Sequence, residues 1–205
     1  MSNINVSNCS LLQVLECYII SVDSIIIPLL LAVLSAMWIM LPAYLPNPVA
    51  ALMGGGTPID FGKKLSDGKR ILGEGKTYRG LLCGVLAGIA IGLIQIWLED
   101  SYSWDFLPHH TLASIVLLSL GALLGDMGKS FLKRRLGKDR GTKWPVADQY
   151  DLVVGALVLL LLFDPSWLVA NFTLPIIIII IILTPILHRA VNIIGYISGI
   201  KEVPW

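Results

Sequence analysis

The 205-residue sequence contains few charged residues. Only 14% of its residues are charged and 56% are hydrophobic, whereas an average soluble domain has roughly 25% charged residues. The mean hydropathy is +0.79, and the net charge of +1 comes from 15 basic and 14 acidic side chains. So little charge excludes an ordinary soluble protein and indicates an integral membrane protein. The balanced charge gives no support for binding of nucleic acid, and we expect none.

Cysteines are also scarce, and their positions exclude the usual metal-binding patterns. Cys9, Cys17 and Cys83 have none of the paired spacings that zinc sites require. Cys9 and Cys17 share the N-terminal tail and could form a disulfide, whereas Cys83 lies in an apolar run as a small core residue. The tail, residues 1–23, has no basic residue and no cleavage motif, so no cleaved signal peptide is predicted.

Apolar runs are abundant, and five of them are long enough to cross a bilayer. A spanning helix needs about 20 largely apolar residues. The predicted spans are about 24–45, 80–98, 111–132, 148–168 and 172–190. They leave no room for a soluble domain. The sequence therefore predicts an all-α integral membrane protein, with residues 1–205 forming a single membrane-embedded catalytic domain.

The basic residues are concentrated in a few segments. Six lie in the loop 46–79 and seven lie in the segment 129–143. The other two are Arg189 and Lys201, near the C-terminus. With five spans, all four locations fall on one side of the membrane.

The opposite side has no basic residue. The tail 1–23 and the loops 99–110 and 164–171 contain neither Lys nor Arg. Because cytoplasmic loops carry the excess of Lys and Arg, we expect the N-terminus outside and the C-terminus in the cytoplasm. The protein is then a multi-pass protein of the cell membrane with two basic cytoplasmic loops, 46–79 and 133–147.

Two of the spans are too short unless they include acidic residues. The uncharged run Thr111–Gly125 has 15 residues, which cover about 22 Å as a helix, less than the ~30 Å of the hydrocarbon core. The run Leu152–Phe163 has 12 residues. The first helix must continue through Asp126, and the second can begin early enough to include Asp148 and Asp151. Ionisable groups at such depth are candidates for a functional site.

The three carboxylates, Asp126, Asp148 and Asp151, predict a metal site. Adjacent short helices would bring them together, and they would repel one another unless a cation lay among them. Mg²⁺ prefers oxygen ligands and binds one or two carboxylates together with substrate phosphates. We therefore expect these three residues to bind Mg²⁺. The alternative is that Asp126 pairs with Lys129 one turn later and that the other two only cap the next helix.

Basic and hydroxyl side chains accompany these carboxylates. Ser130, Lys133 and Arg134 follow Asp126 at helical spacing and share its face. The glycine-rich loop 54–79 allows its backbone to approach phosphates closely, although a basic loop of this kind can also be a solvated connector. Carboxylates with Mg²⁺ beside a basic clamp suit phosphoryl or nucleotidyl transfer. We place Lys133 with the carboxylates as catalytic, and the candidate substrate-binding residues are Lys69, Arg70, Lys76, Thr77, Arg79, Ser130 and Arg134.

The segment from Gly125 to Asp151, GDMGKSFLKRRLGKDRGTKWPVADQYD, resembles the signature of the CTP-dependent phosphatidate cytidylyltransferases. Gln149 stands where that group has Arg, and residues 144–147 replace its His-Gly-Gly triplet. The CDP-archaeol synthases, the archaeal branch of the group, are more similar. They share the small size, the five spans, the stretch DGKRILGEGKTYRG before the second span and the Asp-Gln-x-Asp ending. The matching residues are Ser130, Lys133-Arg134, Lys138-Asp139 and Asp148-Gln149-Tyr150-Asp151.

This resemblance covers the chain from about Asn47 onward and implies an activity. It implies Mg²⁺-dependent transfer of a cytidylyl group from CTP to an isoprenoid ether lipid phosphate, 2,3-bis-O-geranylgeranylglycerol 1-phosphate, giving a CDP-lipid and pyrophosphate. CTP would enter an active site at the cytoplasmic face. The alternatives are a CTP-dependent polyprenol or lipid kinase and, in a different class, a small ion transporter. The sequence makes no prediction of oligomeric state.

Overall fold

The computed structural model describes residues 11–138 and 142–200, with side chains from Ser24 onward. Within these residues the chain forms helices and two isolated bridges, and no β-strand. The helices are α1 (Leu11–Tyr44), α2 (Pro46–Leu52), α3 (Tyr78–Tyr102), α4 (Leu112–Arg135), α5 (Pro145–Phe163), α6 (Pro165–Asn171) and α7 (Leu174–Ile197). The all-helical prediction is confirmed, while the possible Cys9–Cys17 pair lies outside the side chains that are described.

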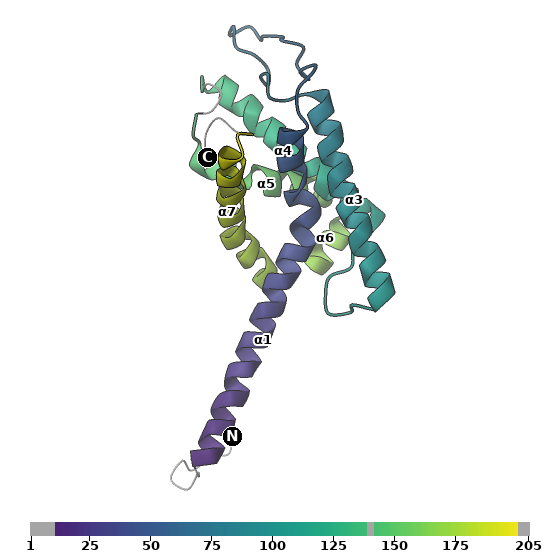
Figure 1. The fold of residues 1–205 in the computed structure, drawn as a ribbon, viewed down its shortest axis with the longest axis vertical. Helices are drawn as coiled ribbons and strands as arrows, with labels where there is room; N and C mark the ends of the chain where they lie inside the picture. The colour runs from purple at the N-terminus through teal and green to yellow at the C-terminus, as the bar shows by residue number, and fades with distance from the viewer. Residues whose placement is uncertain (1–10, 139–141, 201–205) are drawn as a thin grey trace.

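Five helical segments are long and apolar enough to span a membrane, which confirms the predicted number. α1 and α2 together provide the first of them, Ser24–Leu52, and α3, α4, α5 and α7 provide the others. The N-terminal part of α1 extends away from the bundle, while its C-terminal part packs among the other helices (Figure 1). The loop between α2 and α3 covers the end of the bundle that lies farthest from the N-terminus (Figure 1).

Helix α2 lies within the segment 46–79 that the sequence predicts as a loop. Pro46 occupies its first turn, where the missing N–H costs nothing because no intrahelical acceptor is available there. The proline that suggests a chain break therefore starts a helix. As a result the first spanning segment reaches Leu52, and the loop begins there.

The fourth predicted span, 148–168, has different limits in the structure. α5 starts three residues earlier, at Pro145, and ends at Phe163. Asp164 then begins α6, since its Oδ1 accepts a hydrogen bond of 3.2 Å from the Trp167 backbone N–H. The predicted span thus covers two helices, α5 and α6, and Asp164, the N-cap of α6, lies between them. The early start confirms the expectation that Asp148 and Asp151 lie within the helix.

A row of glycines lets α3 pack tightly against its neighbours. Gly88 would place a Cβ 2.4 Å from the Ser119 Oγ and Gly92 would place one 2.4 Å from Ile115, both on α4. Such close approach of backbones is typical of small residues at four-residue spacing in membrane helices. The buried glycines of the row are Gly80, Gly84, Gly88 and Gly92.

Helices α4 and α5 approach each other even more closely, next to the acidic residues. A Cβ at Gly125 would lie 2.0 Å from the Asp151 carbonyl oxygen, and one at Gly155 would lie 2.1 Å from the Gly121 carbonyl oxygen. Any side chain at these positions would force the helices apart. This contact fixes Asp126, the next residue on α4, beside Asp151 on α5.

Hydrogen bonds attach α7 to the rest of the bundle. The Tyr44 hydroxyl at the end of α1 lies 2.8 Å from the Thr184 hydroxyl on α7. The Tyr150 hydroxyl of α5 donates to the Ile181 carbonyl at 2.7 Å. These two bonds hold the middle of α7 against α1 and α5, with Thr184 buried.

A buried carboxylate joins the helices at the end of the bundle away from the α2–α3 loop. Glu99 on α3 accepts hydrogen bonds from the Trp38 indole at 2.9 Å and from the His110 backbone N–H at 3.1 Å. Burial lowers the pKa of His110, against the opposing effects of its contact with the Trp38 carbonyl and of the Glu99 charge. Glu99 therefore connects α1, α3 and the segment before α4.

Candidate active site

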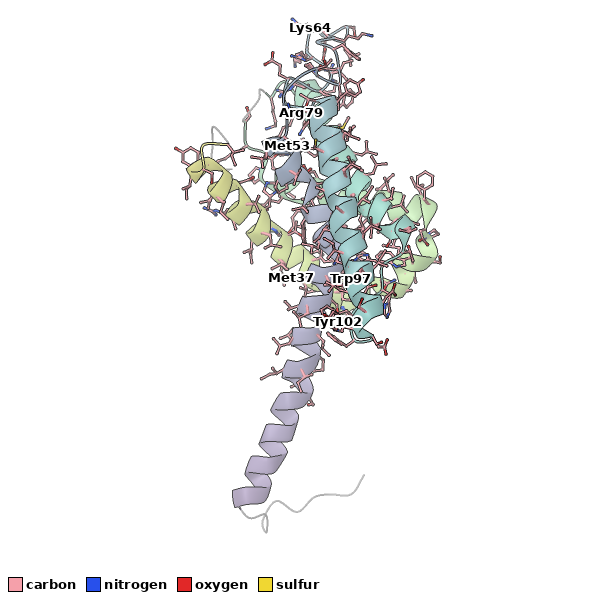
Figure 2. All side chains as sticks on the ribbon, turned by 45° about the vertical axis from the view of Figure 1, so that its right-hand side comes forward. Met37, Met53, Lys64, Arg79, Trp97 and Tyr102 are labelled. Atoms are coloured by element: carbon pink, nitrogen blue, oxygen red, sulfur yellow. The ribbon has the colours of Figure 1, made fainter. Side chains whose placement is uncertain are left out.

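The loop between α2 and α3 folds onto the C-terminal end of α4. Arg135 donates to Asp67 at 2.7 Å and to the Arg70 carbonyl at 2.6 Å. The two predicted basic segments therefore lie together at one end of the bundle. Figure 2 shows Lys64 and Arg79 at this end, while Trp97 and Tyr102 lie at the other end of α3.

Asp60 organises this loop. Its buried carboxylate accepts hydrogen bonds from the Arg70 guanidinium at 2.6 Å and from the backbone N–H groups of Gly62, Leu72 and Gly73 at 3.1, 3.0 and 2.9 Å. Burial acts to raise the pKa of Asp60, but the Arg70 and backbone donors outweigh it and hold this pKa well below its usual range. Because the anchor stays ionised at neutral pH, the loop keeps its shape there.

Three carboxylates from two helices converge on one ammonium group. The Lys129 Nζ on α4 lies 3.1 Å from Asp126 Oδ1, 3.5 Å from Asp148 Oδ1 and 2.5 Å from Asp151 Oδ2. The Asp151 side chain is only 2% exposed and that of Lys129 is 14% exposed. The sequence predicts a cation among these carboxylates, and in this structure the cation is a lysine of the same chain.

Two further lysines extend this cluster on either side. Lys76 from the α2–α3 loop forms an ion pair with Asp126. Lys133 lies 2.5 Å from Asp148 Oδ1 and donates to the Thr142 carbonyl at 2.8 Å. The result is a row of alternating charges in which every carboxylate contacts at least one ammonium group. We call it the charged wall, and its members are Lys76, Asp126, Lys129, Asp148, Lys133 and Asp151.

The alternative interpretation of the acidic residues is also correct in part. Asp126 does pair with Lys129 one turn later. Asp148 does act as a helix cap, since its Oδ2 accepts a hydrogen bond of 2.7 Å from the Trp144 backbone N–H. Each of these local roles uses one oxygen of the carboxylate. The other oxygen contacts a different lysine of the charged wall, which is Lys76 for Asp126 and Lys133 for Asp148.

The carboxylates of the charged wall suit Mg²⁺ binding by one or two of them at a time. Within the described part of the chain, no three His, Cys, Asp or Glu side chains are arranged to hold one ion together. Asp151 Oδ2 is buried and has no hydrogen-bond donor, although Lys129 lies within ion-pair distance of it. An ion that takes one or two carboxylates and completes its shell with water and substrate phosphate matches this donor set.

Two cavities meet at the charged wall. The first has a volume of about 480 Å³ and is strongly basic. The second has a volume of about 740 Å³ and lies between the loop and the spanning helices α2, α3, α4, α5 and α7. Both are lined by Glu74, Gly75, Lys76, Asp126, Lys129 and Lys133. These shared residues place the two cavities next to each other.

Most of the predicted site residues line these cavities. The first cavity contains Lys69, Arg70, Lys76, Asp126, Ser130, Lys133 and Arg134, and the second contains Lys76, Thr77, Asp126, Lys133, Asp148 and Asp151.

Thr77 and Arg79 differ from the others. The Thr77 hydroxyl caps α3 by accepting a hydrogen bond of 3.1 Å from the Gly80 N–H. Arg79 is exposed on the first turn of α3 and lines neither cavity.

Sequence reasoning missed the two residues that hold the site together. Lys129 is assigned only to a local pair, yet its position three residues after Asp126 and four before Lys133 puts it on the same helical face. Asp60 gives no such signal, since all but one of its partners lie 10 to 13 residues away in an irregular loop.

Comparison with known proteins identifies related chains. A family model described as CarS-like, CDP-archaeol synthase, matches residues 12–205. A CDP-archaeol synthase of Methanoregula boonei is 67% identical over 166 residues, which are 81% of this chain and all of the relative. The corresponding proteins of Methanoculleus marisnigri and Methanosarcina mazei are 61% and 50% identical over the same shares.

A solved structure shows a similar arrangement of helices. It is described as an intramembrane enzyme for archaeal membrane lipid biosynthesis. The TM-score is 0.64 at 36% sequence identity, and the match covers 78% of this chain and 94% of the other. Sequence and fold therefore point to the same group of proteins.

Proposed function

This chain belongs to the CDP-archaeol synthase family, and from that premise we propose that it transfers the cytidylyl group of CTP to an isoprenoid ether lipid phosphate. The acceptor proposed is 2,3-bis-O-geranylgeranylglycerol 1-phosphate, and the products are a CDP-lipid and pyrophosphate. The observation that carries this proposal is that the charged wall borders two cavities, one strongly basic and one among the spanning helices. A nucleotidyl transfer between a soluble and a membrane-bound substrate needs such a junction.

The first cavity suits the triphosphate of CTP. Its basic side chains come from both the α2–α3 loop and the C-terminal half of α4, so they surround an anion from two sides. Charge-assisted hydrogen bonds from Lys and Arg to phosphate are about twice as strong as neutral ones. The basic residues of this cavity are Lys69, Arg70, Lys76, Lys129, Lys133, Arg134 and Lys138.

The second cavity suits the lipid phosphate. It lies among spanning helices, and its lining combines the charged wall with apolar side chains such as Leu81, Leu123 and Met127. A lipid can therefore keep its isoprenoid chains in the bilayer while its headgroup reaches the wall. The volume of about 740 Å³ falls in the range of about 300–1,000 Å³ typical of small-molecule sites.

The chemistry requires alignment and charge neutralisation more than proton transfer. A phosphate oxygen of the lipid attacks the α-phosphorus of CTP, a new P–O bond forms, and the bond to the β-phosphate breaks as pyrophosphate leaves. The lipid phosphate is already an anion at neutral pH, so no strong base is needed. Lys76, Lys129 and Lys133 face both cavities and can stabilise charge on the entering and leaving oxygens.

We assign Asp126, Asp148 and Asp151 to Mg²⁺ binding, one or two at a time. When bound, the ion supplies positive charge that offsets the charge on the triphosphate. The carboxylates of this chain then orient the lysines beside them. The ammonium of Lys129 must share the carboxylates with the ion or move toward the substrate phosphates.

The side of the membrane follows from charge and from the source of CTP. The loop 53–77 and the C-terminal end of α4, which together carry most of the basic residues, lie at one end of the bundle (Figure 1). The positive-inside rule assigns that end to the cytoplasm, where CTP is available. We therefore propose a multi-pass membrane enzyme with its active site at the cytoplasmic face and its N-terminus outside.

A defined mixture of purified components tests the proposed acceptor. We expect the protein, with CTP and Mg²⁺, to form a CDP-lipid from the geranylgeranyl ether lipid phosphate faster than from an ester-linked phosphatidate. EDTA should stop the reaction and added Mg²⁺ should restore it. Thin-layer chromatography of labelled product measures both effects. Absence of CDP-lipid with every lipid phosphate, or undiminished synthesis in EDTA, would contradict the proposal.

A further inference from the structure

Arg135, the last residue of α4, binds three acceptors of the α2–α3 loop. Its Nη1 donates to Asp67 Oδ2 at 2.7 Å, and its Nη2 donates to the carbonyls of Arg70 at 2.6 Å and Lys69 at 3.3 Å. The guanidinium lies over the ring of Phe131, one turn earlier on α4, with its central carbon 5.3 Å from the ring centroid. Arg135 is thus supported by its own helix and reaches the loop from there.

Neither Arg135 nor Asp67 lines the first or the second cavity. Arg134, the residue before Arg135, does line the first cavity. The contact between Arg135 and Asp67 therefore lies outside the places proposed for the two substrates. It can affect a substrate only through the position of other residues or through its charges.

The loop has internal bonds that do not involve Arg135. Asp60 accepts hydrogen bonds from the Arg70 guanidinium and from backbone N–H groups of the loop itself. A backbone bond of 3.1 Å also joins the Ile71 N–H to the Lys63 carbonyl across the loop. The shape of the loop and its attachment to α4 therefore depend on different residues.

The attachment places two cations of the loop in the first cavity. Lys69 and Arg70, whose carbonyls Arg135 binds, both line that cavity together with residues of α4. The Lys69 Nζ lies against Gly137, just beyond α4, where a Cβ would be only 2.9 Å from it. The ion pair of Lys76 with α4 holds the later part of the loop separately. Arg135 thus acts on the part of the loop that carries Lys69 and Arg70.

We propose that Arg135 is a positioning residue for CTP, which holds the loop against α4 so that Lys69 and Arg70 face the triphosphate. This inference rests on the proposed function, in which the first cavity receives the triphosphate. A docked loop is ready to bind the nucleotide. An undocked loop has to be ordered when CTP binds, and that cost lowers the affinity. The lipid phosphate, in the second cavity, does not depend on this contact.

Loss of the contact should weaken the binding of CTP alone. Arg135→Met keeps an apolar chain over Phe131 and removes all three hydrogen bonds, so the Kd for CTP should rise about tenfold. Isothermal titration calorimetry in detergent measures this Kd. The KM for CTP should rise equally, while the KM for lipid phosphate and the kcat at saturating CTP should stay near wild type. Arg189→Met, at an exposed position of α7, removes a charge of the same kind and is the matched control.

Substitution of Asp67 separates positioning from the effect of charge alone. Removing a negative charge beside a basic cavity should by itself favour an anion such as CTP. Asp67→Asn should instead raise the Kd for CTP about threefold, because a hydrogen bond to an ionised acceptor is about twice as strong as one to a neutral acceptor. The double variant Asp67→Asn/Arg135→Met should bind CTP no more weakly than Arg135→Met, since both changes break one contact.

The Asp67 variant also keeps the test decisive if Arg135→Met does not fold. Asp67 is exposed, and Asn can still accept the bond of 3.0 Å that the Lys69 N–H donates to Asp67 Oδ1. The turn at this point of the loop should therefore survive the substitution.

The outcomes separate this inference from the proposed function. A wild-type Kd for CTP in Arg135→Met would overturn the positioning role. Tighter binding of CTP by Asp67→Asn would overturn it too, because Arg135 would then act through its charge. An equal rise in the KM for lipid phosphate would indicate general damage and have the same consequence. If wild type binds CTP and forms no CDP-lipid, while both variants bind CTP more weakly, the positioning role stands and the proposed reaction fails. A wild type that binds no CTP would overturn both.

Discussion

Replacing Asp151 with Asn is expected to lower kcat by about 10³-fold, the upper range for removing one preorganised group that stabilises transition-state charge. The side chain is 2% exposed and contacts the ammonium of Lys129. Asn has nearly the same shape but no charge, so its oxygen holds a cation much more weakly than the carboxylate does. The helices should stay in place because the close contact at Gly125 involves the Asp151 backbone and not its side chain.

The measurement is the initial rate of CDP-lipid formation at saturating CTP and lipid phosphate. Asp100→Asn is the matched control, since Asp100 is exposed at the other end of α3 and its change should leave the rate unaltered. Asp148→Asn should also abolish most turnover, because Asp148 contacts Lys133. A near-normal rate in the Asp151 variant, with a wild-type Tm, would show that this carboxylate has no part in catalysis.

Replacing Lys129 with Met should lower both turnover and stability. Among the side chains that the structure describes, Lys129 alone contacts all three carboxylates. Removing one partner of a buried ion pair costs about 3–5 kcal/mol. Without metal, the variant should therefore unfold at a markedly lower temperature than wild type. We expect turnover to fall about 10²-fold, since one of the charges that face the reacting phosphates is lost.

The response of the Tm to Mg²⁺ distinguishes the loss of the Lys129 charge from a simple loss of packing. An ion can replace the missing ammonium, so Mg²⁺ should raise the Tm of Lys129→Met more than that of wild type. Lys129→Arg, which keeps the charge, should lie between the two. Lys64→Met, in the exposed part of the loop, serves as the control. A Lys129→Met variant with wild-type Tm in EDTA would contradict the role assigned to this lysine.

The spanning helices could be predicted because their cause is visible in the sequence. Runs without charge define all five. Because two of these runs are too short to cross the bilayer, Asp126, Asp148 and Asp151 must lie within helices. Helices α2 and α6 could not be predicted in the same way. Each has seven residues and starts at a proline, and such a segment has the composition of a turn.

The site was predictable where it depends on helical spacing. In the loop, the basic residues that line the cavities were predicted, but the contacts that hold the loop in place were not. Asp126, Ser130, Lys133 and Arg134 line one cavity, as their spacing indicates. Arg79 lines neither cavity, because α3 begins at Tyr78 and its buried face follows Gly80 and Gly84. The contacts of Asp60 arise from irregular backbone turns, which leave no period in the sequence.

The fate of the phosphates of CTP tests the central claim most directly. Purified protein is incubated with lipid phosphate, Mg²⁺ and CTP labelled at either the α- or the γ-phosphorus. Transfer across the charged wall predicts that the α-label enters the lipid and that the γ-label appears in pyrophosphate. A γ-label in the lipid, with CDP as the other product, would instead identify a CTP-dependent lipid kinase and contradict the account.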